Sequence, residues 1–316
     1  MSRSKSIITI GLSPSWDITC RGRNLNWGLH ETLDEQTIRP AGKALNVSRA
    51  LAWMGQRSIA AGLWGRDDYE QMLRAMQSLN RHIKIEMTPV VGSTRRNITV
   101  VDTVKGREIH LRDKSRLASV KALKKLRDDL GAIVRKGSVC VFAGTMPGDD
   151  LLDDVIGLME FCKSRGAKLV VDTSGPALKK MVDTGLVWLI KPNVEELCDL
   201  SGDIIKDGPV SLAKAARRLL DRVGIVLISR GGKGSVVVTE KAAWQVRSLG
   251  RAKVFSTVGC GDYLLAGFLQ GLMDKSNAAS ALGTATQVAT AKAWGWTESK
   301  TWPEVRKRMK VEINRI

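Results

Sequence analysis

Short apolar runs alternate with longer helical patterns along most of the chain. The runs are rich in β-branched residues, as in SIITIGL, GSVCVFAG, AKLVVDTS, LVWLIKPN and GIVLISRG. The segments between them repeat apolar residues at helical spacing, as in PVSLAKAARRLLDRVG. Fully apolar strands that alternate with helices are typical of a parallel sheet covered on both faces. The pattern therefore predicts an α/β fold with a doubly wound, mostly parallel sheet.

Two stretches break this alternation. Residues 13–40 are largely polar, and residues 93–112 alternate like two antiparallel strands around Lys105-Gly106. Both stretches suit a small β lid over a site at the edge of the sheet. The chain shows no internal repeat and no low-complexity linker. We therefore expect one domain over residues 1–316, with lid segments at about 13–40 and 93–112.

The length of the apolar runs and the pattern of cysteines bear on the cellular location of the protein. No apolar run approaches the roughly 20 residues needed to span a bilayer. The five cysteines are scattered and show no metal-ligand spacing, which argues for a reducing compartment. We expect a cytoplasmic protein without a membrane partner.

The chain is strongly basic, with a formal net charge of +18 from 50 Lys and Arg against 32 Asp and Glu. Such a charge attracts polyanions, so nucleic acid must be considered. Yet the lysines of residues 121–127 interleave with Leu123, Leu126 and Leu130 in helical fashion, as on the solvated face of an amphipathic helix. The chain shows no recognisable nucleic-acid motif. We expect a solvated basic surface and no nucleic-acid partner; a non-catalytic polyanion-binding protein is the alternative.

The strongest local signal for chemistry is the segment STVGCGD at residues 256–262, which a helical pattern follows. Gly259 and Gly261 let the backbone turn tightly and leave its N–H groups uncovered. The helix that follows directs the positive end of its dipole at the same place, which makes an anion site. Asp262 could there take a proton from a hydroxyl next to a bound phosphate. The alternative is a helix start with an ordinary aspartate cap.

A second glycine-rich segment follows the strand pattern GIVLIS. It consists of Ser229, Arg230, Gly231, Gly232, Lys233 and Gly234. The spacing is not that of a P-loop, and a hairpin pattern follows it instead of a helix. The segment is either a nucleotide-binding turn or a plain glycine-rich turn.

A third candidate, the segment KPNVEE, follows the strand pattern that ends at Lys191. Asn193 and Glu196 stand three residues apart, on one face of the helix that begins there. Oxygen ligands at that spacing could hold magnesium through water. The same spacing also matches a capping box at a helix start.

Polar residues near the N-terminus and in the lid could recognise a sugar. Asp17 follows the first strand, and Gly42, Lys43 and Asn46 open the first long helix. Lys43 and Asn46 could hydrogen-bond a polyhydroxyl ligand. Arg95, in the lid, offers a planar fork suited to a phosphate.

The order and spacing of these motifs resemble the ribokinase-like (PfkB) family of carbohydrate kinases. The family's two signatures resemble AGKALN near the N-terminus and VGCGD at residues 258–262, with AGTMPG at 143–148 between them. The likeness covers about residues 6–295. The phosphosugar branch, with 1-phosphofructokinase and tagatose-6-phosphate kinase, is similar in ITIGLSPSWD, in PAGKALNVSRAL and in Thr94-Arg95-Arg96-Asn97.

The resemblance implies a role for each candidate. On the sugar side, Asp17 and Asn46 would bind the sugar's hydroxyls. Arg95 would bind the phosphate that the substrate already carries. The same pocket would be lined by Gly42, Lys43 and Thr145. On the nucleotide side, Lys191 and Asn193 would contact phosphates, Glu196 would position magnesium, and the turn at 229–234 would shape the site. Gly259, Cys260 and Gly261 would form the anion hole, and Asp262 would be the base.

The activity implied by the resemblance is ATP-dependent phosphorylation of fructose 1-phosphate to fructose 1,6-bisphosphate, with magnesium and, as an option, a monovalent cation such as potassium. The alternatives are tagatose-6-phosphate kinase and a kinase of an unphosphorylated sugar or nucleoside. A homodimer through the lid is a further expectation.

The chain departs from the family pattern at three places. Cys260 replaces a small Ala or Ser of the family. Ala44 stands where the branch often has Gly, so we expect the methyl group of Ala44 to crowd the sugar pocket. The segment LRDKSRLA at 111–118 lacks the glycine turn of the branch.

Overall fold

The computed structural model of the protein describes residues 6–79, 81–274 and 277–316. Within those residues, ten strands form the main sheet. In chain order they are β1 (Ile7–Gly11), β4 (Ser58–Gly65), β5 (Ile83–Val90), β8 (Val139–Ala143), β9 (Lys168–Asp172), β10 (Val187–Ile190), β11 (Ile225–Ser229), β12 (Ser235–Thr239), β13 (Ala243–Ser248) and β14 (Val311–Arg315). Their order across the sheet is β14-β13-β12-β11-β10-β9-β8-β1-β4-β5. The pairs from β11 to β5 are parallel, and only the β11–β14 side is antiparallel, as the apolar runs predict.

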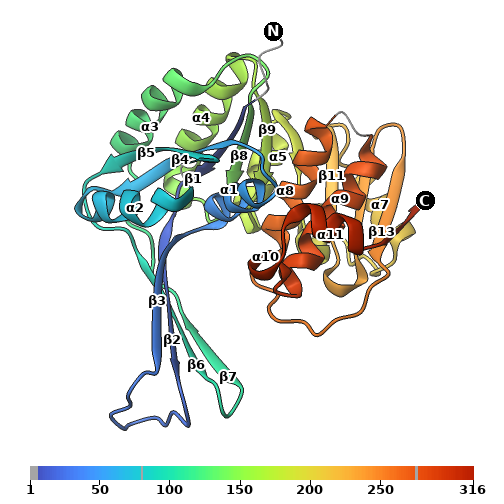
Figure 1. Cartoon of the computed structure of the whole chain (residues 1–316). Coiled ribbons are helices and arrows are strands. Elements are labelled where there is room, and N and C mark those ends of the chain that lie inside the picture. The colour runs from blue at the N-terminus through green and yellow to red at the C-terminus, as the bar shows by residue number, and fades with distance from the viewer. Residues whose placement is uncertain (1–5, 80, 275–276) are drawn as a thin grey trace.

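Helices cover both faces of this sheet (Figure 1). They are α1 (Lys43–Trp53), α2 (Tyr69–Met76), α3 (Val120–Ile133), α4 (Leu152–Ser164), α5 (Gly175–Asp183), α6 (Val194–Ser201), α7 (Pro209–Arg217), α8 (Cys260–Met273), α9 (Ala278–Ala293), α10 (Trp296–Ser299) and α11 (Trp302–Arg308), with 3-10 turns η1 (Arg66–Asp68), η2 (Gln77–Leu79), η3 (Asp149–Leu151) and η4 (Gly231–Lys233). Buried side chains of α3 to α7 fill one layer of the core, and those of α1, α8 and α9 fill the other. The doubly wound α/β prediction is confirmed.

Helices α8 and α9 form a tight antiparallel pair that carries one side of the site. Gly271 of α8 is required at their contact, because a Cβ there would lie 2.6 Å from the Cα of Ala281. The close approach fixes the C-terminal end of α9 beside the N-terminal end of α8. The direction of both helix dipoles at the site follows from this packing.

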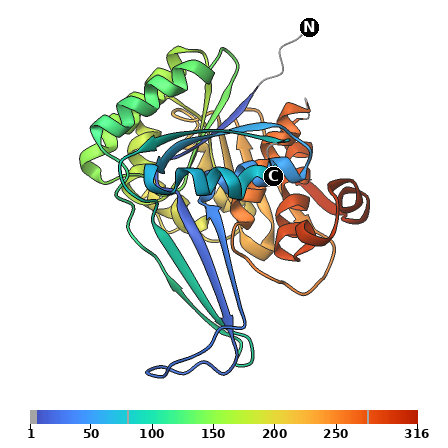
Figure 2. The same ribbon diagram turned by 60° about the vertical axis from the view of Figure 1, so that its left-hand side comes forward.

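A second sheet forms the lid. In the described part of the chain it has four strands in the order β3-β2-β6-β7, namely β3 (Glu35–Ala41), β2 (Ser15–Gly22), β6 (Arg96–Asp102) and β7 (Arg107–Leu111). β6 and β7 pair antiparallel across the Lys105-Gly106 turn, as the alternation of residues 93–112 predicts. The lid projects from the body in both views (Figures 1 and 2). Among the described residues, no helix combines the length and the apolar character that crossing a membrane requires.

Candidate active site

Five neighbouring strands, β1, β8, β9, β10 and β11, run parallel and end at one edge of the main sheet. Backbone bonds join their ends: Gly144 N–H donates to the carbonyl of Asp172 at 3.0 Å, and Ser229 N–H to the carbonyl of Pro192 at 3.0 Å. Ligands of open α/β sheets bind at this edge. Residues from distant parts of the sequence, including Lys191, therefore gather there.

Asp262 lies in the first turn of α8 and points at α1. The turn before it needs Gly259, whose φ of 78° is in the left-handed region. Asp262 is buried, and its Oδ2 accepts a 2.8 Å hydrogen bond from Nδ2 of Asn46. The carboxylate is thus held across the site by another helix, as a positioned acid–base group would be. It does more than cap its own helix.

Asp172, at the end of β9, is the central residue that the sequence analysis missed. Its side chain is fully buried, and its Oδ1 faces two ammonium groups, Nζ of Lys43 at 3.2 Å and Nζ of Lys191 at 3.4 Å. Among the described residues its Oδ2 has no hydrogen-bond partner. The signal in the sequence was an acidic residue that closes an apolar strand, KLVVD, at the edge where ligands bind.

The charges of this cluster shift one another's protonation. Burial, and after it the negative charge of Asp172, raises the pKa of Asp262 to about 7. The hydrogen bond from Asn46 and the charges of Lys43 and Lys191 act in the opposite direction and only partly offset this rise. For Lys43, burial lowers the pKa, but the carboxylates around it outweigh burial, so the pKa lies above its ordinary value. A carboxylate whose pKa lies near neutrality can both take up and release a proton under working conditions.

The raised pKa of Asp262 predicts the pH dependence of turnover. A base must be ionised to accept a proton, so activity should be lost as the pH falls through the pKa of about 7. We expect kcat/KM to fall about tenfold per pH unit below about pH 6 and to level off above about pH 8. Initial rates at constant ionic strength and fixed Mg–ATP concentration check this. A flat profile from pH 5 to 9 would contradict the role of Asp262.

The backbone of residues 259–261 faces the same centre. A Cβ on Gly261 would lie 3.2 Å from Nζ of Lys191, so this ammonium sits beside the loop. Cys260 keeps its thiol in contact with the carbonyl of Ser256, at 3.6 Å. Burial raises the pKa of this thiol to about 11, so it adds no negative charge to the loop. The loop, with Lys191 next to it, is suited to bind an anion.

In the lid, Asp17 and Asn97 are paired across strands β2 and β6. Asp17 Oδ1 accepts bonds from Ser15 Oγ at 3.0 Å and from Asn97 Nδ2 at 3.2 Å. Oδ1 of Asn97 is buried without a partner among the described residues. The sequence analysis quoted Asn97 in a motif but gave it no role; its buried, unpartnered acceptor makes it a candidate contact for a polar ligand.

Arg95 joins three segments at the base of the lid. Its Nε donates to the carbonyl of Pro14 at 3.2 Å, its NH2 group to that of Ser13 at 2.9 Å and its NH1 group to that of Asp113 at 3.0 Å. A guanidinium has five N–H donors, so these contacts leave others for a ligand. Arg95 therefore has an anchoring contact that the sequence did not reveal, and its phosphate-binding role stays a prediction.

The start of α1 lies against two strand ends. Gly42 precedes the helix, and a Cβ on Gly144 would be 3.8 Å from Cβ of Lys43, so Gly144 lies beside that lysine. Thr145, which follows Gly144 in the chain, is exposed. Ala44 is buried and packs on β1. The expectation that its methyl group crowds the sugar pocket is wrong, because it faces Gly11, where a Cβ would lie 3.2 Å away.

On the nucleotide side, Asn193 and Glu196 form a complete capping box at the start of α6. Oδ1 of Asn193 accepts from the Glu196 N–H, and Oε2 of Glu196 accepts from the Asn193 N–H, both at 2.8 Å. The structural interpretation of this pair is thus confirmed. It does not remove the metal role, because Glu196 still has a second carboxylate oxygen.

The glycine-rich turn after β11 is braced by a carboxylate. Asp207 accepts from Nε of Arg230 at 2.8 Å and from Nζ of Lys233 at 2.6 Å. These two bonds hold the pKa of Asp207 below its ordinary value. The cations of the turn are paired with protein, and Gly231 and Gly232 are exposed. That the turn with Ser229 and Gly234 binds a nucleotide stays a prediction.

The residues at the strand ends fit magnesium that arrives with a nucleotide. In the described residues no three His, Cys, Asp or Glu side chains gather as a complete metal site. Magnesium commonly takes one or two carboxylates and completes its shell with phosphate and water. Glu196 and the unpartnered Oδ2 of Asp172 are such oxygens.

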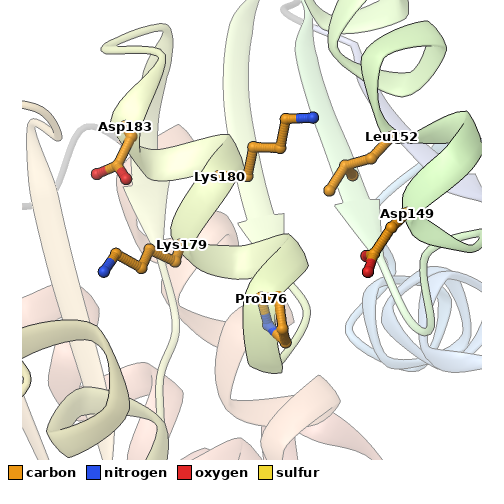
Figure 3. A pocket seen from close by; sticks show the side chains of 6 residues that line it. All are labelled: Asp149, Leu152, Pro176, Lys179, Lys180 and Asp183. Carbon is orange, nitrogen blue, oxygen red and sulfur yellow. The ribbon is translucent and has the colours of Figure 1, made fainter.

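A separate hollow of about 340 Å³ lies between α4 and α5. Figure 3 shows its lining residues, Asp149, Leu152, Pro176, Lys179, Lys180 and Asp183. Lys180 is paired with Asp153 at 2.7 Å. The hollow shares no residue with the site around Asp262.

Comparison with known proteins agrees with this geometry. The sequence pattern of the pfkB family carbohydrate kinases matches residues 6–293. A 1-phosphofructokinase of Vibrio cholerae is 27% identical over 289 residues, which cover 90% of this chain and 89% of that protein. A tagatose-6-phosphate kinase of Staphylococcus epidermidis is 24% identical over 269 residues, covering 84% and 85%.

Solved structures show the same fold. Phosphofructokinase-2 from Escherichia coli in complex with fructose-6-phosphate superposes with a TM-score of 0.87 at 20% identity, covering 96% of this chain and 98% of that one. The same enzyme in complex with potassium gives a TM-score of 0.88 at 21% identity, with the same coverage. Because the family pattern spans nearly the whole chain, including both glycine segments and Asp262, this protein belongs to the pfkB family of carbohydrate kinases.

Proposed function

We propose that the protein transfers the γ-phosphoryl group of ATP to a primary hydroxyl of a sugar phosphate, converting fructose 1-phosphate to fructose 1,6-bisphosphate. One observation carries the proposal: a buried carboxylate, Asp262, is held by Asn46 at 2.8 Å beside a glycine loop and the ammonium of Lys191. That arrangement joins a base, an anion-binding backbone and a cation. The 1-phosphofructokinase relatives supply the choice of sugar.

The chain's own residues account for the transfer. Asp262 accepts the proton of the acceptor hydroxyl while the hydroxyl oxygen bonds to the γ-phosphorus of ATP. The bond between the γ-phosphorus and the bridging oxygen of the β-phosphate breaks, which leaves ADP. The N–H groups of 259–261 and Lys191 stabilise negative charge on the transferred oxygens. Lys43 and Lys191 are oriented by Asp172. Glu196 and Asp172 would hold magnesium, which would further neutralise the charge of the phosphates when bound.

The lid would close the sugar side. Asp17 and Asn97 offer carboxylate and amide oxygens for sugar hydroxyls. Arg95 directly precedes β6, and its carbonyl accepts the N–H of Trp16 on β2 at 2.8 Å. Closure over these residues would exclude water, which otherwise competes as the acceptor. Tagatose 6-phosphate is the alternative acceptor, because a kinase of that sugar is nearly as similar. Screening sugar phosphates and free sugars with ATP tests the proposal.

Replacing Arg95 should separate the classes of acceptor. Arg95→Ala should lower kcat/KM for fructose 1-phosphate by about 30-fold, because charged hydrogen bonds worth about 2 kcal/mol are lost. It should affect free fructose much less, since that substrate has no phosphate for the guanidinium. Steady-state rates on both acceptors measure the ratio.

Free fructose and the Arg96→Ala variant serve as controls for the Arg95→Ala experiment. Loss of the contacts to Ser13, Pro14 and Asp113 would lower the rates on both acceptors equally, so only the ratio reports the phosphate. Arg96→Ala, at the exposed neighbouring position on β6, should leave the ratio unchanged. Equal losses on both acceptors in Arg95→Ala would remove the case for a phosphosugar.

Assembly and location remain proposals. The lid exposes large apolar side chains, among them Trp27, Leu29, Ile38 and Leu111, which supports a homodimer through the lid. One solved relative is described as a tetrameric form. The five cysteines, all among the described residues, are free thiols, which supports a reducing, cytoplasmic location.

A further inference from the structure

The last turn of α9 supports the segment that leads into the glycine loop. The carbonyl of Ala293 accepts the N–H of Phe255 at 2.7 Å and that of Ser256 at 3.3 Å. A helix carries negative partial charge at its C-terminal end. The end of α9 therefore places negative potential behind a loop that must bind an anion.

Lys292, one residue before that carbonyl, has no role in the mechanism described above. Its side chain is only 17% exposed, lies over the ring of Tyr263 with Nζ 5.5 Å from the centroid, and pairs with Oε1 of Glu298 at 3.4 Å. Tyr263 directly follows Asp262 on α8. The positive charge of Lys292 also opposes the rise in the pKa of the Cys260 thiol that burial causes. The ammonium thus faces the first turn of α8.

Stability alone gives a weak reason for a cation at this position. Lysine in the last turn suits the dipole of α9 but opposes that of α8, whose positive end lies at the same place. The pair with Glu298 contributes little, because that carboxylate is 62% exposed. A cation beside a helix N-terminus becomes favourable once an anion binds between them.

We propose that Lys292 is a positioning residue that acts as a built-in cation. Its ammonium offsets the negative end of α9 and keeps the 256–261 loop positive, so that the loop holds the transferred phosphoryl group without recruiting a monovalent cation. The proposal rests on the proposed kinase function. It also replaces the expectation of potassium as an optional cofactor with a charge carried by the protein.

A charge-removing variant tests this directly. Lys292→Met keeps an apolar stem over Tyr263, and we expect kcat to fall on the order of 10-fold, as for a charge that acts near the transferred group. The thermal midpoint of the ligand-free protein should change little. Lys292→Arg should keep most of the activity. Lys300→Met is the matched control, because Lys300 also lies over an indole ring, 5.2 Å from the centroid of Trp296, and should match the wild type.

Cation dependence gives a second readout. Wild-type rates should be the same in potassium and tetramethylammonium chloride at equal ionic strength. The smaller Lys292→Ala variant should regain activity when potassium or methylammonium is added. A wild type that requires potassium, or a Lys292→Met variant as active as Lys300→Met, would overturn the proposal.

Anion binding separates this proposal from the proposed function. If the folded wild type phosphorylates no sugar, the proposed function fails, and Lys292 is then judged by binding of tripolyphosphate. That anion should raise the thermal midpoint of the wild type and of Lys300→Met more than that of Lys292→Met. Equal increases in all three would contradict the assignment of Lys292.

Discussion

Replacing Asp262 by asparagine is expected to abolish most turnover while leaving the fold intact. The amide has nearly the shape of the carboxylate and can keep the contact with Asn46, but it cannot accept the proton of the acceptor hydroxyl. The loss of a positioned base should lower kcat on the order of 100- to 10,000-fold. ATP should still bind, because the loop, Lys191 and the 229–234 turn are untouched.

The control and the contradicting result for Asp262 are clear. Asp274→Asn changes the same residue type at the other end of α8, where the side chain is exposed and bonds Gln270; it should be fully active. Thermal unfolding and ATP titration of both variants exclude a folding defect. Activity of Asp262→Asn within a few-fold of the wild type would show that another group is the base.

Replacing Asp172 by asparagine should damage both stability and activity. The substitution removes the negative charge that faces Lys43 and Lys191, and the second of these ammonium groups is itself buried. Breaking a buried pair by removing one partner costs about 3–5 kcal/mol of unfolding free energy. Because both lysines lose their orientation, kcat should also fall, on the order of 100-fold. The removal of the Asp172 charge should lower the pKa of Asp262 and move the acid limb of the pH profile to lower pH.

A surface pair provides the comparison for Asp172. Asp183 pairs with Arg222 at 2.5 Å, but both side chains are well exposed, so Asp183→Asn should cost at most about 1 kcal/mol and no activity. Denaturant unfolding, rates and pH profiles of the two variants check this. If Asp172→Asn unfolds like Asp183→Asn and retains its rate, Asp172 does not organise the lysines.

The fold could be predicted because its determinants are local. Apolar runs without alternation, such as VCVF and KLVV, indicate strands buried on both faces, and these became β8 and β9. The lid followed from a change of period around Lys105-Gly106. Asp262 could be singled out because the glycines that free the backbone and the helix that follows are its neighbours in sequence.

The rest of the site could not be predicted because it depends on which strands are neighbours. In the sequence, Asp172 is only the last residue of an apolar strand. Its contacts with Lys43 and Lys191 form because β9 lies between β8 and β10 in the folded sheet. Arg95 is similar, since its contacts come from Ser13, Pro14 and Asp113, which are distant in sequence. The spacing of Asn193 and Glu196 fits both a capping box at a helix start and a pair of metal ligands. Only the structure shows that the capping box forms at the start of α6.

The acceptor of the phosphoryl group is the most direct test of the account. Purified wild type with ATP and magnesium should convert fructose 1-phosphate to fructose 1,6-bisphosphate, with the product identified by phosphorus NMR and ADP release measured in parallel. We expect kcat/KM for this acceptor to exceed those for tagatose 6-phosphate and free fructose by at least about tenfold, and Asp262→Asn to form almost no product. A folded, ATP-binding wild type that phosphorylates no sugar phosphate, or that prefers free fructose, would contradict the account.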